Sequence, residues 1–189
     1  MINCLYHPFQ HWAEKGSVYI ISDPHFADSD TKLMDADWIS PEEQVRRINK
    51  MCSKNDTLIL LGDIGNAEYA KRLKGYKILI AGNHDAVSLY QNVFDEIYTG
   101  PLMIAPKILL SHEPIYGLTF CVNIHGHDHG GVMRYIDESG AKHLNLAANV
   151  CKYTPINLKK EIEKGLLCDV DDIHRQTIDN AVERKISFG

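Results

Sequence analysis

The sequence predicts one domain of mixed helix and strand structure, in the α+β or α/β class. Short apolar runs bounded by glycine or polar residues recur along the chain, and such runs indicate buried strands. Segments with helical periodicity alternate with them. A chain of 189 residues that is 44% hydrophobic and 24% charged has the length and composition of an ordinary globular domain. Because no repeat, low-complexity tract or linker interrupts it, we expect residues 1–189 to form a single domain.

The clearest strand predictions are five short apolar runs, each followed closely by glycine or a polar residue. They lie at residues 18–21, 58–61, 78–80, 108–110 and 122–124. Shorter strands, separated by turns rich in glycine, proline and serine, are expected later in the chain. These lie at residues 93–99, 102–104, 132–136 and 143–147.

Two helices are expected between the first strands. Residues 40–43, Ser-Pro-Glu-Glu, form a capping box with proline at the first helical position. The helix should continue to about Met51, since the apolar residues Val45, Ile48 and Met51 fall three apart and share one face. A second helix is expected over residues 67–73, ahead of a glycine that would end it.

Three segments fall outside this alternation. Residues 1–16 contain several aromatic residues and are expected to pack on the body as an N-terminal extension. Residues 158–189 have the amphipathic character of helices and should also pack on the body. The loop at residues 27–38 carries four aspartates. It is either a solvated loop or part of the edge of a substrate site, because it follows directly after His25.

Composition excludes several classes of protein. The formal net charge of −5 argues against extended duplex nucleic-acid binding, although a nucleotide or a nucleic-acid end stays possible. No apolar stretch approaches the ~20 residues of a membrane span, and the first residues lack the features of a signal peptide. The five cysteines contain no CxxC pair, which is typical of idle thiols in a reducing compartment. We therefore expect a cytoplasmic protein without a membrane partner.

Aspartate, histidine and asparagine residues follow the five main strands. They are Asp23 and His25, then Asp63, then Asn83, His84 and Asp85, then His112, and finally His127 and His129. In sheets of this kind, ligands bind where strands end, so these side chains should meet at one edge. Carboxylate, imidazole and amide oxygen without thiolate suit divalent Mn, Fe, Co, Ni or Zn. The pattern therefore predicts a metal site.

The number of candidate ligands favours two divalent ions over one. Two aspartates, one asparagine and at least four histidines would overfill a single coordination shell. Two ions that share a bridging carboxylate fit better, and ions paired at about 3.5–4 Å commonly hydrolyse phosphate esters. Two dications and two carboxylates leave a charge of about +2, or about +1 with a bridging hydroxide, which would attract phosphate and stabilise its transition state.

The chain resembles the calcineurin-like metallophosphoesterases, in particular small bacterial and phage-type members. Their pattern is Asp-x-His, Gly-Asp, Gly-Asn-His-Asp/Glu, His and Gly-His-x-His, and all five blocks occur in order between Asp23 and His129. The resemblance implies a four-layer αββα sandwich, in which two packed mixed β-sheets are flanked by helices. It also implies a binuclear metal centre.

The same resemblance implies a role for each block. One metal would be held by Asp23, His25, Asp63 and His129. The second would share Asp63 as a bridge and take Asn83, His112 and His127. His84 would be the histidine that steadies the phosphoryl oxygen and protonates the leaving group, and Asp85 would orient its ring.

Two neighbouring side chains have alternative readings. His125 would share one face of an extended segment with His127 and His129, and only the Gly-His-x-His register selects the last two as ligands. His125 is then expected to support the ligands or to pack. Glu113 follows His112 directly and could either position substrate or lie on the surface.

The chain also departs from some relatives. The serine/threonine phosphatase branch has an arginine after its Gly-Asp block, whereas this chain has Gly-Asp-Ile-Gly-Asn at residues 62–66. Small bacterial and phage members often have Asp-Thr-His-Phe-Gly-His at the first block, and here residues 23–28 are Asp-Pro-His-Phe-Ala-Asp. Few residues separate Asp85 from His112, which leaves no room for a cap domain.

These observations predict a binuclear metal-dependent phosphoesterase, and specifically a phosphodiesterase, that uses a metal-bridging hydroxide and His84 as proton donor. Its substrate would be a small phosphoester, a nucleotide or a nucleic-acid end. Two alternatives are a non-catalytic interaction module that keeps the fold and a nuclease that processes RNA or DNA ends.

Overall fold

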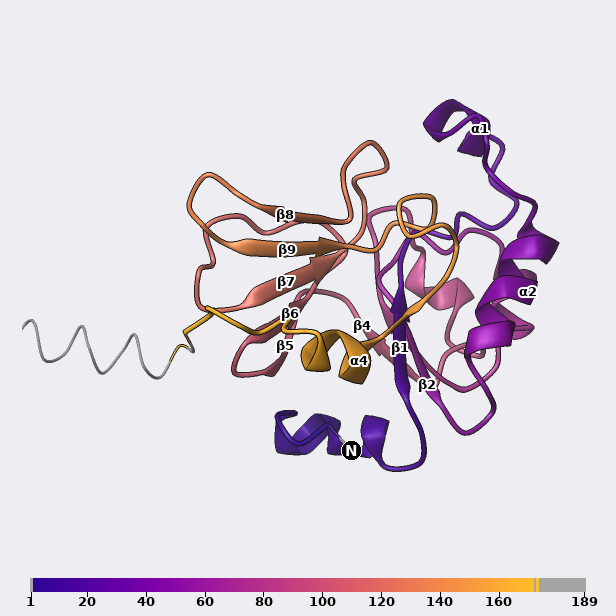
Figure 1. Cartoon of the computed structure of the whole chain (residues 1–189). Helices are drawn as coiled ribbons and strands as arrows, with labels where there is room; N and C mark the ends of the chain where they lie inside the picture. Colours follow the sequence, from indigo (N-terminus) through magenta and orange to yellow (C-terminus); the bar gives the residue numbers. More distant parts are fainter. Residues whose placement is uncertain (1, 172, 174–189) are drawn as a thin grey trace, which may run out of the picture.

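The computed structural model describes residues 2–171 and 173 (Figure 1). It shows a mixed α/β fold with two five-stranded sheets. The first sheet has the order β10 (Ile156–Asn157), β1 (Val18–Ile21), β2 (Thr57–Leu60), β3 (Tyr76–Ile80) and β4 (Glu96–Tyr98). The second has the order β5 (Leu102–Ala105), β6 (Ile108–Leu110), β7 (Val122–His125), β9 (Lys142–Asn145) and β8 (Arg134–Ile136). The five main strand predictions are confirmed.

Strand direction brings the ends of the main strands together. Strands β1 to β4 run parallel, and β10 pairs antiparallel with β1. In the second sheet β6, β7 and β9 are parallel, with antiparallel β5 and β8 at the edges. The backbone N–H of Ser22 donates to the carbonyl of Leu146 at 2.9 Å, which joins the end of β1 to the segment after β9. The carboxyl ends of both sheets therefore lie side by side.

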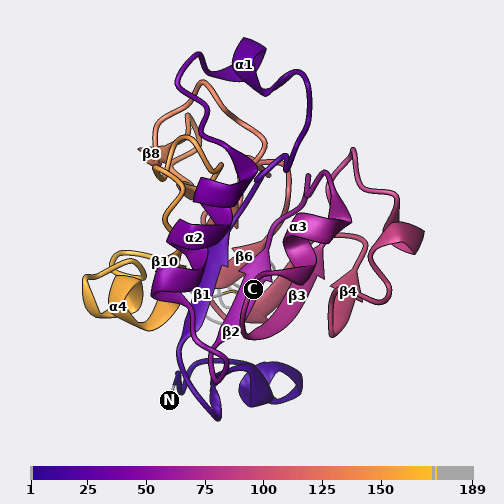
Figure 2. The ribbon, with the colours of Figure 1, turned by 90° about the vertical axis from the view of Figure 1, so that its right-hand side faces the viewer.

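The core lies between the sheets and beneath the helices. All four residues of β2 are buried, because the second sheet covers one face while α2 (Pro41–Met51) and α3 (Ala67–Lys71) lie over the other (Figure 2). Alternate residues of the second sheet, including Val122, Ile124 and Leu144, join the same buried cluster. Sheets with apolar inner faces of this kind owe most of their stability to that burial.

The helix signals are largely confirmed. The hydroxyl of Ser40 accepts a hydrogen bond from the N–H of Glu43 at 3.3 Å and caps α2, as the capping box predicts. Val45 and Ile48 are buried, but Met51 is 39% exposed because it lies at the last turn. Helix α3 ends two residues earlier than predicted. A short α1 (Thr31–Met34) within the aspartate-rich loop and the 3₁₀ helix η2 (Val87–Leu89) were not predicted.

Three strands after residue 90, β4, β8 and β9, are shorter than their apolar patterns predict. Residues 93–95 lie outside β4, since the N–H groups of Val93 and Phe94 bond back to the carbonyl of Tyr90 in a turn. Strand β8 begins only at Arg134, and β9 ends at Asn145. Strand β10, two residues long, carries no sequence signal of its own.

The N-terminal extension packs on the body, as expected. Its 3₁₀ helix η1 (His7–Ala13) buries Trp12, which is 1% exposed. The carboxylate of Glu96 on β4 anchors it by accepting hydrogen bonds from side chains of the extension and of the first sheet. The donors are Trp12 Nε1 at 2.9 Å, His11 Nε2 at 2.6 Å, Tyr76 Oη at 2.9 Å and Tyr98 Oη at 2.6 Å.

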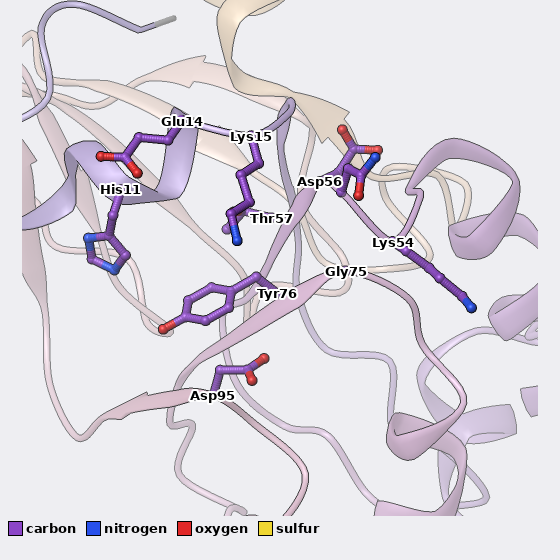
Figure 3. A pocket seen from close by; sticks show the side chains of 10 residues that line it. His11, Glu14, Lys15, Lys54, Asp56, Thr57, Gly75, Tyr76 and Asp95 are labelled. Atoms are coloured by element: carbon purple, nitrogen blue, oxygen red, sulfur yellow. The ribbon is translucent and has the colours of Figure 1, made fainter.

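A cavity of about 390 Å³ lies between the extension and the amino ends of β2 and β3 (Figure 3). Side chains of both charge signs line it, including Lys15 and Asp95. Asp56 at its wall accepts the N–H groups of Ser17 and Ser53, both at 2.8 Å, and so closes the loops there. The cavity is at the end of the sheet opposite to the predicted metal ligands.

The described residues contain few helices near the second sheet. Helix α4 (Leu158–Glu163) contacts β1 and β10 of the first sheet. Asn123, His125 and His143 alternate along β7 and β9 with residues of the buried cluster, and so they face the other side of the second sheet. There the N–H of Ile115 donates to Asn123 Oδ1 at 2.7 Å. The expectation of C-terminal helices from residue 174 onward lies outside the described residues. No described helix is long and apolar enough to cross a membrane.

The Glu96 anchor gives a prediction about stability. Burial alone would raise the pKa of the Glu96 carboxyl, but the hydrogen bonds it accepts hold the pKa below its ordinary value of 4.5. The stabilisation is therefore fully present above pH 4.5 and is lost as the pH falls through the folded-state pKa. Glu96→Gln should lower the free energy of unfolding by about 1–3 kcal/mol at neutral pH, and by less in acid.

Urea denaturation of both proteins at neutral and acid pH measures this difference. Glu14→Gln is the matched control, because Glu14 lies exposed in the same extension and should change the free energy of unfolding little. A Glu96→Gln variant as stable as the wild type at neutral pH would contradict the anchor.

Candidate metal centre

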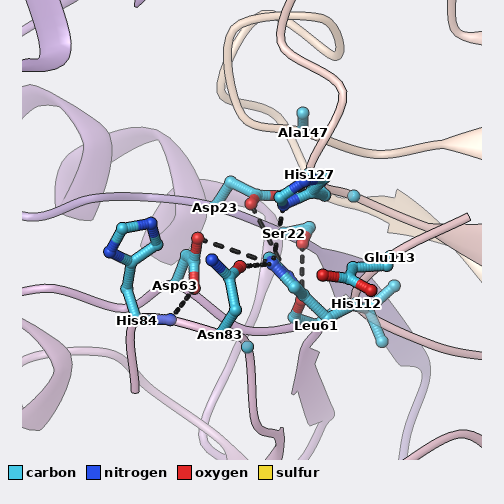
Figure 4. Close-up of polar contacts among 12 residues, drawn as sticks. Ser22, Asp23, Leu61, Asp63, Asn83, His84, His112, Glu113, His127 and Ala147 are labelled. Carbon is cyan, nitrogen blue, oxygen red and sulfur yellow. Dashed lines mark hydrogen bonds and ion pairs between the residues drawn. The ribbon is translucent and has the colours of Figure 1, made fainter. Parts of the chain in front are cut away.

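The structure brings the predicted ligands together at the carboxyl ends of β1, β2, β3, β6 and β7 (Figure 4). Six of the seven form two groups of three, and within each group the potential ligand atoms lie within 4.8 Å of one another. The first is Asp23, His25 and His129, and the second is Asp63, His112 and His127. Each group could hold a metal ion.

Two members of the first group are almost completely buried, and His129 is half-buried. Asp23 is 0% exposed and His25 is 3% exposed. One oxygen of Asp23, Oδ2, accepts the backbone N–H of His127 at 2.8 Å. The other oxygen, Oδ1, and the Nε2 atom of His25 are buried without a hydrogen-bond partner. Buried polar atoms without partners are rare and costly, so these two atoms mark a place where a cation would bind.

In the second group, several hydrogen-bond acceptor atoms lie close to one another. His112 Nδ1 lies 2.8 Å from the carbonyl of Leu61, which can only accept, so Nδ1 carries the hydrogen and a neutral ring leaves Nε2 as a bare lone pair. That Nε2 lies 2.8 Å from Asn83 Oδ1 and 3.5 Å from Asp63 Oδ2. His127 Nδ1 lies 3.1 Å from it. A cation between these atoms could bind the lone pairs of His112 Nε2, Asn83 Oδ1 and Asp63 Oδ2 together.

Asp63 lies between the two groups. Its Oδ2 atom is 3.6 Å from His25 Nε2 and 3.5 Å from His112 Nε2. Its Oδ1 atom accepts the backbone N–H of His84 at 3.0 Å. One carboxylate is thus within reach of imidazoles from both groups, which is the position that a bridging ligand would take.

Hydrogen bonds also orient the histidines of the first group. His25 Nδ1 lies 3.3 Å from Asp28 Oδ2, and His129 Nδ1 lies 3.1 Å from Asn149 Oδ1. Because the Asn149 amide nitrogen donates to the carbonyl of His129 at 2.9 Å, its oxygen is the acceptor. Both rings therefore donate through Nδ1 and present Nε2 to the centre, as metal-binding histidines commonly do.

Burial changes the protonation of these groups in the direction that a metal site needs. Burial raises the pKa of Asp23 well above 3.8, so an ionised Asp23 requires positive charge nearby. Burial also lowers the pKa values of His25 and His112 below 6.5. Neutral imidazoles keep the lone pairs with which a metal is bound. The donor set of carboxylate, imidazole and amide oxygen fits borderline divalent ions.

The backbone at the ligands is strained. Asp23, His25, Asp63 and His127 have φ values of 52°, 40°, 50° and 66°, a region that residues with side chains rarely adopt. Two glycines make room for the carboxylates. A Cβ atom on Gly82 would lie 2.2 Å from Asp63 Oδ1, and one on Gly126 would lie 1.9 Å from Asp23 Oδ2. Strain of this kind is typical of functional sites.

The structure corrects the role expected of Asp85. We expected Asp85 to orient the ring of His84, but its carboxylate instead accepts three backbone N–H groups, those of Asp63, Ile64 and Gly82, each at 2.9 Å. Asp85 therefore positions the turns that carry Asp63. The ring of His84 is exposed and lies 6.1 Å from the ring of His25, centroid to centroid.

Sequence reasoning missed several residues that support the centre. Asn149 and Asp28 orient ligand histidines, and Asn149 Nδ2 also lies 3.4 Å from Asp35 Oδ2. Trp38, 5% exposed, packs its ring 6.0 Å from that of His25 and 5.5 Å from that of His129. The loop at residues 27–38 is thus packed against the site. Apart from its position next to His25, nothing in its sequence pointed to these contacts.

His125 supports the ligands and is not part of either group. Its Nδ1 donates to the carbonyl of Gly126 at 2.8 Å, and its Nε2 accepts from Tyr135 Oη at 3.1 Å. These bonds fix the turn that carries His127. Glu113 is exposed beside His112.

Metal content tests the two groups directly. The wild type should bind two divalent ions per chain. His129→Ala and His127→Ala should each reduce the stoichiometry to about one or lower the affinity of one site by about 10- to 100-fold or more, because each removes a ligand from a different group. Elemental analysis and calorimetric titration with Mn²⁺ measure this.

His7→Ala is the control, since His7 is an exposed histidine of η1 far along the chain from either group. It should leave two ions bound. A wild type that binds no divalent ion, or equal metal content in all four proteins, would contradict the assignment.

Comparisons with known proteins show the fold but no function. No family model matches the chain, and no curated protein is significantly similar to it. A solved structure that resembles it is the protein of unknown function AQ665 from Aquifex aeolicus. The two chains are 28% identical with a TM-score of 0.63, over 78% of this chain and 98% of that one. The likeness confirms the arrangement of the two mixed sheets.

Proposed function

We propose that this protein is a binuclear metal-dependent phosphoesterase of the calcineurin-like type, with phosphodiesters as its substrates. The observation that carries the proposal is the place of Asp63, whose Oδ2 lies within 3.6 Å of an imidazole nitrogen from each ligand group. Two sites joined by one carboxylate suit phosphoester hydrolysis. The two packed mixed sheets, with α2 and α3 over the first, suit three layers of the αββα sandwich that this type implies. The described residues contain few helices near the second sheet, so the outer helical layer there does not add to the support.

Two bound divalent ions would supply Lewis acidity to activate water and to offset the charge of the phosphoryl group. Asp23, His25 and His129 would hold one, Asn83, His112 and His127 would hold the other, and Asp63 would lie between them. The protein contributes rigidity. Hydrogen bonds from Nδ1 fix three of the histidine rings, and fixed ligands lower the reorganisation that the reaction requires.

His84 is the proton donor in this proposal. The ring of His84 is exposed, and its backbone N–H donates a hydrogen bond to Asp63 Oδ1 at 3.0 Å. The side chain therefore lies at the mouth of the site and is not one of the proposed metal ligands. An imidazolium there can give a proton to the oxygen of the leaving group. It lies on the His25 side of the centre.

Two alternatives are weaker on these observations. A non-catalytic module would have no need of buried carboxylates and imidazoles that lack hydrogen-bond partners, as Asp23 Oδ1 and His25 Nε2 do. For a nuclease that processes nucleic-acid ends, the net charge of −5 disfavours contacts with an extended strand and leaves binding of the end itself open.

Hydrolysis of bis(p-nitrophenyl) phosphate with added Mn²⁺ tests the proposal. Asp63→Asn should lower kcat/KM by at least about 100-fold, since it weakens the carboxylate shared by both groups. His84→Asn should lower kcat by about 100- to 10,000-fold while two ions stay bound, because it removes only the proton donor.

His7→Asn is the control and should keep full activity, because His7 is exposed and outside both ligand groups. A wild type inactive on phosphodiesters and phosphomonoesters with Mn, Fe, Co, Ni and Zn would refute the proposal. So would an Asp63→Asn variant as active as the wild type.

A further inference from the structure

Two cavities flank the candidate metal centre. One, of about 360 Å³, is lined by His25 of the first group together with Asp28, Lys32 and Trp38. The other, of about 390 Å³, is lined by Asn83 and His112 on the opposite side of the centre. A phosphoryl group held between the two ligand groups would thus have a cavity on either side of it. That arrangement suits a phosphodiester, which carries two substituents.

The position of His84 indicates which substituent of the phosphodiester would occupy each cavity. The ring of His84 lies next to that of His25, with the two ring centroids 6.1 Å apart. His25 and Asp28 both line the first cavity. The group that receives the proton from His84 would therefore occupy the first cavity. The substituent that stays on phosphorus would occupy the second.

We call the second cavity the retained-arm cavity, because the substituent that stays on phosphorus would occupy it. Its lining includes a negatively charged side chain. Its walls are mainly apolar, with Ile80, Pro101, Pro114 and Ile115, and it contains the exposed carboxylate of Glu113. Among the described residues that line it there is no lysine or arginine to balance that charge. In the first cavity, by contrast, Lys32 Nζ offsets Asp28, although it is tied to the carbonyls of Ala36 and Trp38.

We propose that the retained-arm cavity binds an uncharged substituent of a phosphodiester and that Glu113 rejects substituents that carry a further phosphate. The apolar walls accept a planar or aliphatic group, and the carboxylate can accept hydrogen bonds from hydroxyl groups of a sugar. An additional phosphate near Glu113 would meet a like charge, and no lysine or arginine among the described lining residues would offset it. The substrates are then small diesters with a neutral arm, such as a nucleoside, and not nucleic-acid strands. This inference rests on the proposed function.

A matched pair of substrates tests the inference. The first is thymidine 5′-(p-nitrophenyl phosphate), and the second is the same molecule with a 3′-phosphate, so that the leaving group is identical and only the retained arm differs. With the Mn²⁺-loaded wild type, kcat/KM should be about tenfold higher for the first, on the scale of one like-charge contact near a protein surface. In Glu113→Gln the ratio should fall to about twofold, because the variant removes the like charge and keeps an amide oxygen as acceptor.

Glu138→Gln is the matched control, because it makes the same change in net charge at an exposed glutamate outside the retained-arm cavity. It should keep the wild-type ratio, and all three proteins should bind two Mn²⁺ ions. Calorimetry provides a second measurement that does not depend on turnover. Thymidine 5′-phosphate should bind the wild type more tightly than thymidine 3′,5′-bisphosphate, and Glu113→Gln should reduce that preference.

The outcomes separate this inference from the function on which it rests. Equal kcat/KM for the two substrates in the wild type, or a full preference retained by an active Glu113→Gln variant, would overturn the inference while hydrolysis stands. Failure to hydrolyse any phosphoester would instead overturn the proposed function. The calorimetric comparison would then still decide whether Glu113 discriminates against a second phosphate.

Discussion

The carboxylate of Asp63 and the constraint on its position underlie the rest of the site. Asp85 holds the turn beneath it by accepting three backbone N–H groups, and Gly82 leaves room for its Oδ1. The left-handed backbone at Asp63, with φ of 50°, then turns Oδ2 between the two ligand groups. In the proposed function, this carboxylate would lie between two cations, one in each ligand group.

The fold serves this arrangement through the direction of its strands. Parallel β1, β2 and β3 end at one edge, and parallel β6 and β7 end beside them, so loops from two sheets meet over a rigid core. The costs of burying Asp23 and of holding left-handed backbone at four ligands are local. Packing between the sheets offsets these costs. The N-terminal extension, anchored at Glu96, adds further stability at the opposite end of the first sheet.

The features that depend on residues close together in the chain could be predicted from the sequence. The apolar runs located the main strands, and the capping box at Ser40 located α2. The order of polar residues at strand ends located the ligands, and the family resemblance divided them into two groups. Sequence reasoning failed where a role depends on contacts between distant segments. The carboxylate of Asp85 could bond to its neighbour His84 or to distant backbone, and Asn149 reaches His129 only because the fold brings the two loops together. The local sequence does not indicate the partners of Asp85 or of Asn149.

Anomalous diffraction from crystals of the protein grown or soaked with Mn²⁺ tests the central claim most directly. The account predicts two peaks about 3.5–4 Å apart, one among Asp23, His25 and His129 and the other among Asp63, Asn83, His112 and His127, with the Asp63 carboxylate between them. A single peak, two peaks that do not share Asp63, or no peak at these residues would contradict it.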